Sequence, residues 1–382
     1  GPDPTSGPPE PPAPAPLPLN RWKFNNAAGA VASGATFVDS ISGETATLLG
    51  NGATLNGTAL VLPGTTNGNQ TAAAISAYLD LPNGIVSSKT SMTFETWVRP
   101  LSSKTWQRIF DFGRANLTSG AGASVGEILD GPAAPGGFIA YDNLLLSLNN
   151  NGVLGSHRLE GKIAGTVTGT VDTDLSTATT ASTEYHYVMT VEDGAGAYGS
   201  NGARAKWYRN GIVQGSLDLS YRLRDMADVN NWIGRSQWAA DMNSNMAINE
   251  LRVYDRVISP AEVLSTYNAG AEAFYAAPLA NADAATIHAG QKVRIEVLAN
   301  DSGLLNRGSV EIVTPPATGT ASVSSDGSVL YHHSGTSSTP VVFTYRVFGE
   351  AGVSSTAAVT ISIETALRLP NPSLAMPEAP PT

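Results

Sequence analysis

Hydrophobic and polar residues alternate over many short segments of the chain, a pattern typical of half-buried β-strands. The most informative segment runs from Asn231 to Tyr267, where Ile248, Leu251 and Val253 stand among polar residues. The sequence Ser259-Pro260-Ala261-Glu262 follows and combines an N-cap hydroxyl, a proline at the first helical position and an acidic residue at the third. Because the hydroxyl and the carboxylate can both accept from free backbone N–H groups, a short helix is predicted to start here.

Other segments with strand character are separated by turns such as Asn51-Gly52 and Asn210-Gly211. About ten short strands and one late helix predict an all-β, two-sheet sandwich. Two stretches, 114–137 and 149–183, exceed the length that turns require, and we expect them to be long loops that elaborate one face or edge. The predicted strands are Thr58–Leu62, Ala77–Leu81, Met92–Arg99, Arg108–Gly113, Phe138–Ala140, Leu144–Leu148, Tyr185–Glu192, Ala203–Arg209, Asn230–Ile233 and Ala247–Tyr254.

A second, smaller unit is predicted from three cleanly alternating segments, Val293–Val297, Phe343–Val347 and Val359–Ile363. About 85 residues with such strands fit a smaller immunoglobulin-like β-sandwich. The predicted organisation is a Pro-rich disordered linker at 1–19, the large sandwich at 20–276, the Ig-like domain at 277–364, and a linker at 365–382 that leads to a missing downstream domain.

Composition narrows the classes of partner. The net charge of -10 argues against nucleic acid, which needs a basic stripe to displace phosphate counterions, and against an anionic membrane surface. Acidic polysaccharides are disfavoured in the same way unless calcium or a local basic cluster intervenes. There is no cysteine, which excludes disulfides, thiolate metal sites and cysteine nucleophiles. No apolar run approaches the ~20 residues that span a bilayer, so membrane insertion is not expected, and the chain carries no signal peptide.

Several phrases together resemble the laminin-G-like domains of the concanavalin A-like lectin/glucanase superfamily. They are Met92–Pro100 with Trp106–Gly113, Tyr185–Val191 with Lys206–Gly211, and the segment Asn231–Tyr267 described above. The resemblance implies a concanavalin A-like jelly roll over most of residues 21–270, in a family that mostly binds or spaces rather than catalyses. The sequence departs from the family pattern at Met246, where Gly is usual, and at Asn249, where Asp is usual.

The second unit resembles the cadherin-like or Ig-like modules of bacterial surface proteins. The resemblance rests on Val297-Leu298-Ala299-Asn300-Asp301 and on the later Phe343-Thr344-Tyr345. Such modules serve chiefly as spacers. Together the two resemblances imply an exported fragment of a large bacterial multidomain protein, located outside the cell or at its surface.

No arrangement of residues in the chain makes a positive case for catalysis. Glucanases on this fold need carboxylates that project from one face of a strand, whereas Glu127 and Asp130 have i,i+3 spacing and lie in a Gly/Pro-rich stretch. His186 stands between two tyrosines as in some lyases, but the resemblance places it in a structural strand. His332 and His333 are adjacent and would point to opposite faces. We therefore predict no catalytic residue here; any catalytic domain would lie outside this fragment.

The family resemblance also implies a structural calcium ion. The loop from Val38 to Gly43 matches an early Asp-Ser-Xaa-Gly turn, so Asp39 and Ser42 are candidate ligands. The first and last strands of such folds are neighbours, which makes Glu250 and Asp255 candidates to complete the shell. The alternative is an Asx-turn at Asp39 and ordinary salt bridges at the other positions.

Sugar binding requires an aromatic platform for the apolar face of the ring and polar groups for its hydroxyls. Trp106 follows a polar turn and Trp238 lies in the polar stretch 236–245, so both are predicted to be exposed, whereas the other four tryptophans are predicted to be packing residues. The alternative is that their polar neighbours only complete loop hydrogen bonds. These neighbours, also candidate ligand contacts, are Arg235, Gln237, Asp241 and Tyr141.

We therefore expect a non-catalytic module that binds a polysaccharide or cell-surface glycan and is tethered to other domains of its parent protein. A purely structural spacer or assembly module is the alternative. A polysaccharide hydrolase or lyase with an atypical site is the third hypothesis.

Overall fold

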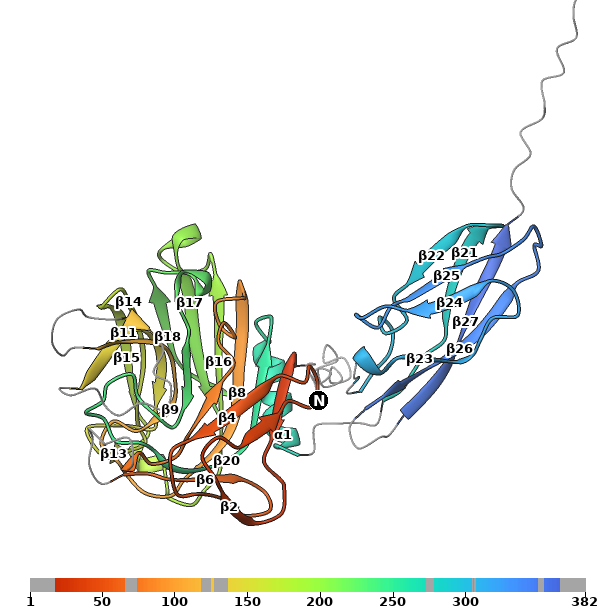
Figure 1. The fold of residues 1–382 in the computed structure, drawn as a ribbon. Helices are drawn as coiled ribbons and strands as arrows, with labels where there is room; N and C mark the ends of the chain where they lie inside the picture. Colours follow the sequence, from red (N-terminus) through yellow and green to blue (C-terminus); the bar gives the residue numbers. More distant parts are fainter. Residues whose placement is uncertain are drawn as a thin grey trace, which may run out of the picture. The chain divides into compact units, whose positions relative to one another are not determined.

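The computed structural model describes residues 18–65, 74–117, 125–126, 137–272, 278–303, 305, 307–349 and 354–364. The predicted linkers at 1–19 and 365–382 lie almost entirely outside the described residues, as do Glu127 and Asp130. The chain forms two compact units, which divide between residues 274 and 275 (Figure 1). Each unit is a β-structure with its own hydrophobic core.

The first unit is a sandwich of two large antiparallel sheets. In its described part, one sheet has nine strands in the order β18-β17-β16-β8-β20-β6-β5-β2, with β1 paired to β20. Its strands are β18 (Ile212–Leu219), β17 (Ala203–Arg209), β16 (Tyr185–Asp193), β8 (Ser91–Pro100), β20 (Asn245–Tyr254), β6 (Leu60–Pro63), β5 (Ala53–Leu55), β2 (Gly29–Val31) and β1 (Asn20–Lys23).

The other large sheet carries the candidate site. Among the described residues its order is β15-β14-β11-β9-β19-β7-β4-β3, with β10 paired to β9. Its strands are β15 (Thr166–Asp174), β14 (Ser156–Ile163), β11 (Phe138–Ser147), β9 (Arg108–Leu117), β19 (Asn230–Ile233), β7 (Tyr78–Leu81), β4 (Thr45–Leu49), β3 (Thr36–Val38) and β10 (Val125–Gly126). A separate hairpin pairs β12 (Asn149–Asn150) with β13 (Val153–Leu154). The fully described 3-10 turns of this unit are Ser176–Ala178, Gly199–Asn201 and Leu223–Asp225.

The core lies between the two sheets because alternate residues of each strand point to opposite faces. Phe94 of β8 meets Phe110 and Phe112 of β9 in edge-to-face contacts, with ring centroids 5.0 and 5.2 Å apart. All three rings are buried, with Trp22 and Trp207 in the same cluster. The polar residues that alternate with them on β9 therefore face away from this core.

The predicted long loop at 149–183 is wrong. About half of it forms β14 and β15, which extend the sheet beyond β11. The signal is present in β14, where Arg158, Glu160 and Lys162 alternate with Leu159, Gly161 and Ile163. Its polar positions are nevertheless mostly buried, a feature that a half-exposed strand pattern does not predict. The two predicted strands at 138–148 are one strand, β11, with a register shift between Ala140 and Asp142.

The predicted helix is confirmed as α1 (Pro260–Ala269). Ser259 Oγ accepts from the backbone N–H of Glu262 at 3.2 Å, and the Glu262 carboxylate accepts from the backbone N–H of Ser259 at 2.7 Å. This is the reciprocal capping arrangement that the sequence predicts. Val263 of the helix packs against Val188 and Tyr254 on the outer face of the first sheet. No helix in the described part of the chain has both the length and the apolar character needed to cross a membrane.

A buried charge network lies on the same outer face. His186 Nε2 is 2.7 Å from Glu95 Oε1, and Arg252 Nη1 donates to Glu95 Oε2 at 3.2 Å. Arg21 Nη2 donates to Glu250 Oε2 at 2.8 Å, which joins the first strand to the last. Burial alone would raise the pKa of Glu95, but Arg252 and the His186 hydrogen bond lower it to about 2. His186 is thus held in a structural ion network.

The second unit is a smaller two-sheet sandwich. Within its described residues, one sheet has the order β21-β27-β26-β23 and the other β22-β25-β24. Its first strand pairs in parallel with its last over six residue pairs, from Asp283↔Val359 to His288↔Glu364. Its elements are β21 (Asp283–His288), β22 (Lys292–Ile295), a 3-10 turn (Arg307–Ser309), β23 (Glu311–Thr314), β24 (Thr320–Val323), β25 (Val329–His332), β26 (Val341–Phe348) and β27 (Ser354–Glu364).

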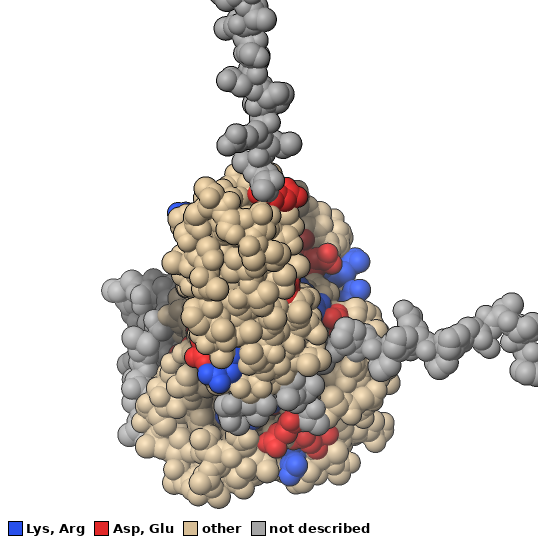
Figure 2. Space-filling model, turned by 90° about the vertical axis from the view of Figure 1, so that its right-hand side faces the viewer, with Lys and Arg blue, Asp and Glu red and all other residues tan. Residues whose placement is uncertain are grey.

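Charged side chains are sparse on the molecular surface, as expected from 14% charged residues. Figure 2 shows one face of the molecule, on which the Lys and Arg side chains lie beside Asp and Glu side chains instead of forming a basic stripe. A basic stripe is the electrostatic footprint of nucleic-acid binding. This face therefore offers no such footprint.

Candidate functional site

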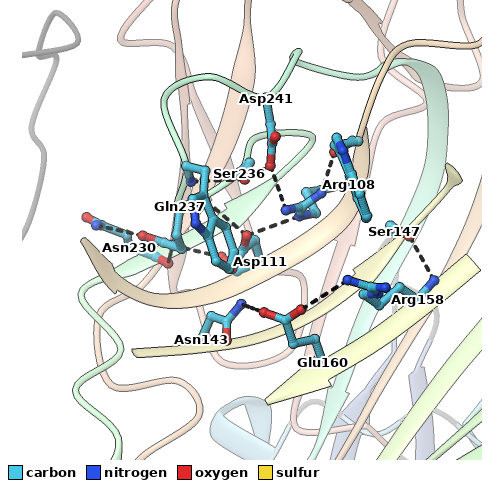
Figure 3. A network of polar contacts seen from close by, with 12 residues as sticks. Arg108, Asp111, Asn143, Ser147, Arg158, Glu160, Asn230, Ser236, Gln237 and Asp241 are labelled. Atoms are coloured by element: carbon cyan, nitrogen blue, oxygen red, sulfur yellow. Dashed lines mark hydrogen bonds and ion pairs between the residues drawn. The ribbon is translucent and has the colours of Figure 1, made fainter. Parts of the chain in front are cut away.

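A row of polar side chains crosses three neighbouring strands on the outer face of the second sheet. Leu145 of β11 pairs with Asp111 of β9 on one side and with Glu160 of β14 on the other. Asp111 and Glu160 are therefore separated by one strand, which places their Cα atoms about 10 Å apart. Asn143, two residues from Leu145 on the same face of β11, donates to Glu160 Oε1 at 3.3 Å. All these polar residues are buried although they face away from the main core (Figure 3).

The loop between β19 and β20 covers part of this row. The backbone N–H of Gln237 donates to Asp111 Oδ2 at 3.0 Å. Its side-chain amide donates to the Asp111 carbonyl at 3.1 Å and to the Asn230 carbonyl at 2.9 Å. Gln237 was predicted as a ligand contact, but the structure places it in the interior, fully buried, where it anchors the loop.

Arg108 connects the strand row to the loop. Its Nε donates to Asp111 Oδ2 at 3.2 Å, and its Nη2 donates to Asp241 Oδ2 at 2.8 Å. A third hydrogen bond runs from Nη1 to the carbonyl oxygen of Trp106. The guanidinium also lies 5.6 Å from the centre of the Trp238 ring. One buried side chain thus contacts both predicted platform residues. Figure 3 shows its pairing with Asp241 and Asp111.

Both candidate tryptophans are half-buried and carry a cation on the ring. Arg158 lies 5.1 Å from the centre of the Trp106 ring, and Lys162 lies 5.0 Å from that of Trp238. Trp106 has φ 56°, a left-handed conformation that is uncommon for a bulky residue and is often found at functional sites. We call Trp106, Trp238, Arg108, Arg158 and Lys162 the tryptophan patch.

The carboxylates below the patch are electrostatically perturbed. Burial raises the pKa of Asp111 to about 7, against the opposing effects of Arg108 and of the Gln237 N–H. Burial also raises the pKa of Asp241, again opposed by Arg108. At neutral pH a substantial fraction of Asp111 is therefore protonated.

Arg235 lies in a separate aromatic cage beside the patch. Its guanidinium is 4.5 Å from the ring centres of Tyr78 and Trp232, and 5.2 Å from that of Phe138. The residue is only 5% exposed, and Nη1 has no hydrogen-bond partner among the described residues. A small pocket opens here, with room for about one water-sized group, far less than the ~300–1,000 Å³ typical of small-molecule pockets. It is lined by Phe138, Arg235, Ser236, Trp238, Ala239, Asp241 and Asn243.

Tyr141 stands in a different group. Arg114 lies 4.9 Å from its ring centre and pairs with Asp142 at 2.6 Å. Of the six predicted ligand contacts, the structure therefore brings together Trp106, Trp238 and Asp241 through Arg108. Arg235 joins Trp238 and Asp241 along the pocket.

The predicted calcium ligands are only partly grouped. Asp39 and Ser42 share a turn, where the Asp39 carboxylate accepts from the Ser42 hydroxyl and from the backbone N–H of Ile41 at 3.0 Å. Glu250 does not join them, because it is paired with Arg21 and Arg252. Asp255 is exposed in the turn after β20.

The residues around Asp39 are nevertheless compatible with a cation. Nδ2 of Asn20 faces oxygens of Asp39, Ser42 and Glu44 at 3.2, 2.9 and 2.6 Å, while its buried Oδ1 has no hydrogen-bond partner among the described residues. Turning this amide would bring four side-chain oxygens together, the donor type that calcium prefers. No group of three or more Asp, Glu, His or Cys in the described part of the chain could hold a metal, so a calcium ion would also need carbonyls or water. Calcium at Asp39 stays a prediction.

The residues that sequence reasoning missed lie on strands instead of loops. Arg158, Glu160 and Lys162 fall in the stretch taken for a loop, although their alternation is a strand signal. Arg108 and Asp111 were read only as part of a strand. Of the two adjacent histidines, His332 is exposed and His333 is buried, with Nδ1 accepting from the backbone N–H of Gly290 at 3.0 Å.

Comparison with known proteins identifies both units. Residues 71–264 match the family model described as concanavalin A-like lectin/glucanases superfamily, and residues 276–362 match the bacterial Ig domain. No curated protein sequence matches the chain. The family matches confirm the predicted jelly roll and the Ig-like module that follows it.

Several solved structures are similar to the chain. Domain 4 of a GH43 extracellular arabinanase from Geobacillus stearothermophilus, in complex with arabinotriose, has a TM-score of 0.39 and 17% identity over 65% of this chain and 97% of that domain. A Trypanosoma rangeli sialidase has a TM-score of 0.42 and 15% identity over 66% of this chain, which spans about a third (32%) of the sialidase. A botulinum neurotoxin binding domain has a TM-score of 0.40 and 10% identity over 86% of this chain and 66% of that domain.

Proposed function

Because the chain belongs to the concanavalin A-like lectin/glucanases superfamily, we propose that its first unit is a non-catalytic module that binds a glycan at the tryptophan patch. The observation that carries the proposal is the pairing of two half-buried tryptophans through one buried arginine. Arg108 hydrogen-bonds the backbone of Trp106 and lies against the ring of Trp238. Two aromatic surfaces held in fixed positions can pack against the apolar faces of sugar rings with little ordering cost.

The polar groups of the patch suit the hydroxyls of a sugar. Arg158 is 27% exposed in its side chain, and the carboxylate of Asp241 is 16% exposed. Both reach solvent beside a tryptophan, where they can exchange water for sugar hydroxyls. The pocket next to Trp238 is too small to enclose a sugar chain, so we expect the glycan to lie across the surface.

A binding role is favoured over hydrolysis because only one of the two carboxylates that pair with Arg108, that of Asp241, reaches solvent. Glycoside hydrolysis needs an acid and a base or nucleophile that both reach the substrate. Asp111 is 0% exposed, and its Oδ2 already accepts from Gln237 and Arg108. The hydrolase alternative predicts new reducing ends when the wild-type protein is incubated with a polysaccharide panel, and loss of that activity in Asp111→Asn. Release of reducing ends at a rate that this variant abolishes would overturn the non-catalytic proposal.

The binding experiment is affinity-gel electrophoresis, followed by calorimetric titration, with neutral and acidic polysaccharides. Trp106→Ala and Trp238→Ala should each weaken binding about tenfold or more, since truncation of an aromatic side chain at the centre of a binding surface typically costs ~2 kcal/mol or more. Tyr198→Ala is the matched control, because Tyr198 is a 46% exposed aromatic in the loop before β17, away from the patch. Wild-type affinity in both tryptophan variants, or no binding by the wild type at all, would favour the spacer alternative.

The bacterial Ig match of the second unit supports an extracellular or cell-surface location for the parent protein. In this proposal the first unit captures the glycan, and the second separates it from other domains of the same protein. Tethering would then raise the effective glycan concentration near those domains.

A further inference from the structure

Charge pairing around Trp238 leaves two cations without carboxylate partners. Arg108 forms ion pairs with Asp111 and Asp241, and Arg158 forms ion pairs with Asp172 and Glu160. Each of these four carboxylates therefore already has an arginine partner. Lys162 and Arg235 reach the same ring or pocket, yet neither forms an ion pair with any of the described residues.

Both of these cations are more than nine-tenths buried. Lys162 is 8% exposed and Arg235 is 5% exposed. Burial lowers the pKa of Arg235, while the Tyr78 hydroxyl and the charge of Asp80 oppose that effect. A buried cation and an unused N–H donor are both unfavourable until a counter-charge or acceptor is supplied.

The two cations lie beside one candidate platform. Lys162 is placed over the ring of Trp238, whereas Arg235 lines the pocket of which Trp238 is another wall. A sugar packed on Trp238 would present its substituents to both. The pocket has room for about one water-sized group, such as a single carboxylate oxygen, which the unused Nη1 of Arg235 can meet with a charge-assisted hydrogen bond.

We infer that the glycan bound at the tryptophan patch carries carboxylate groups, with Lys162 and Arg235 as the residues that receive them. This inference rests on the proposed glycan binding and names its ligand class. The net charge of -10 does not oppose it at this range, since charges beyond about 8 Å are largely screened at physiological ionic strength. The sequence-level objection to acidic polysaccharides thus does not hold at the patch, where the unpaired groups are cations.

The test compares each acidic glycan with its own neutral form. Polygalacturonate, alginate and hyaluronan are titrated beside the same polymers after reduction of their carboxyl groups to alcohols, and arabinan is included as a neutral polymer. The acidic form of at least one polymer should bind about tenfold or more tightly than its reduced form, the size expected for one charge-assisted hydrogen bond. Lys162→Met and Arg235→Met should each lower that preference, and Lys162→Arg should retain it.

The controls separate a lost contact from a lost fold. Tryptophan fluorescence of the unfolding transition shows whether Arg235→Met is folded, and Lys162→Met gives an independent answer if it is not. Binding of reduced or neutral polymers with no preference for the acidic forms overturns the inference and leaves the proposed glycan binding intact. Absence of binding to every polymer overturns both. If Lys162→Met and folded Arg235→Met still bind the acidic form more tightly than the reduced form, other residues receive the carboxylate. That result also overturns the inference.

Discussion

Asp111 makes the stability of the first unit depend on pH in a predictable direction. Burial raises its pKa from 3.8 to about 7 in the folded protein. The folded state therefore binds a proton that the unfolded state releases, and the stability from this group is complete below pH 4 and is lost as pH rises towards 7. Asp111→Asn removes the titration while it keeps a side chain of nearly the same shape.

The size of the effect follows from the pKa difference. Each unit of pH between the two pKa values changes the free energy of unfolding by about 1.4 kcal/mol. Between pH 5 and pH 8, wild type should thus lose about 2.5 kcal/mol relative to Asp111→Asn. Burial lowers the pKa of His157 to about 4, so the contribution of this group to the free energy of unfolding increases as pH rises to 6.5. Its contribution is common to both proteins and cancels in the difference.

The assay is urea unfolding followed by tryptophan fluorescence at pH 5, 6, 7 and 8. The six tryptophans lie at positions 22, 97, 106, 207, 232 and 238, all in the first unit, so the signal does not report the second. As pH rises, the free energy of unfolding of the wild type should fall relative to that of Asp111→Asn. A difference that stays constant within about 0.5 kcal/mol would show that Asp111 titrates normally and would refute the reasoning.

Three further predictions concern the fold. Excess calcium should raise the melting temperature of the first unit by several degrees, because a hundredfold excess over Kd adds about 3 kcal/mol to the free energy of unfolding. Scanning calorimetry with and without chelator checks this, and Asp39→Asn should show no shift. A wild type that also shows no shift would contradict calcium binding at Asp39. Ser259→Ala should cost about 1 kcal/mol in denaturant unfolding, because the α1 cap is lost. Gly113→Ala should cost ~1–3 kcal/mol, because a Cβ there would overlap the Asp142 carbonyl, whereas Gly29→Ala has open space; equal stability of the two variants would contradict this.

Sequence patterns predict the strands and the helix well where buried and exposed residues alternate with the regular period of a strand or a helix. The segment 259–262 carries its own capping chemistry, so local residues suffice to place α1. A half-exposed strand pattern does not predict β14, because this strand buries polar groups on a face that the loop between β19 and β20 partly covers. Lys162 and Glu160 are buried by contacts with residues far along the chain, and no local pattern reports those contacts.

The candidate site was predicted in part for the same reason. Trp106 and Trp238 stand in polar surroundings, which is enough to suggest exposure. Their proximity depends on the contact of Arg108 with Asp241, 133 positions away in the sequence. Gln237 and Arg235 are polar residues of the same stretch, yet they point inward to Asp111 and to an aromatic cage. Which loop residues turn inward is decided by the strands beneath them.

The parallel pairing of β21 with β27 has a mechanical consequence for the second unit. Because its first and last strands run in the same direction, a force that pulls the two ends apart acts along the ladder and loads the hydrogen bonds of all six residue pairs together. In the first unit, β1 and β20 are antiparallel, and Asn20 lies opposite Val253 at one end of the ladder, so the same force separates the pairs one after another. Under tension the Ig-like unit should behave as a shear-resistant link, while the first unit should begin to open at β1.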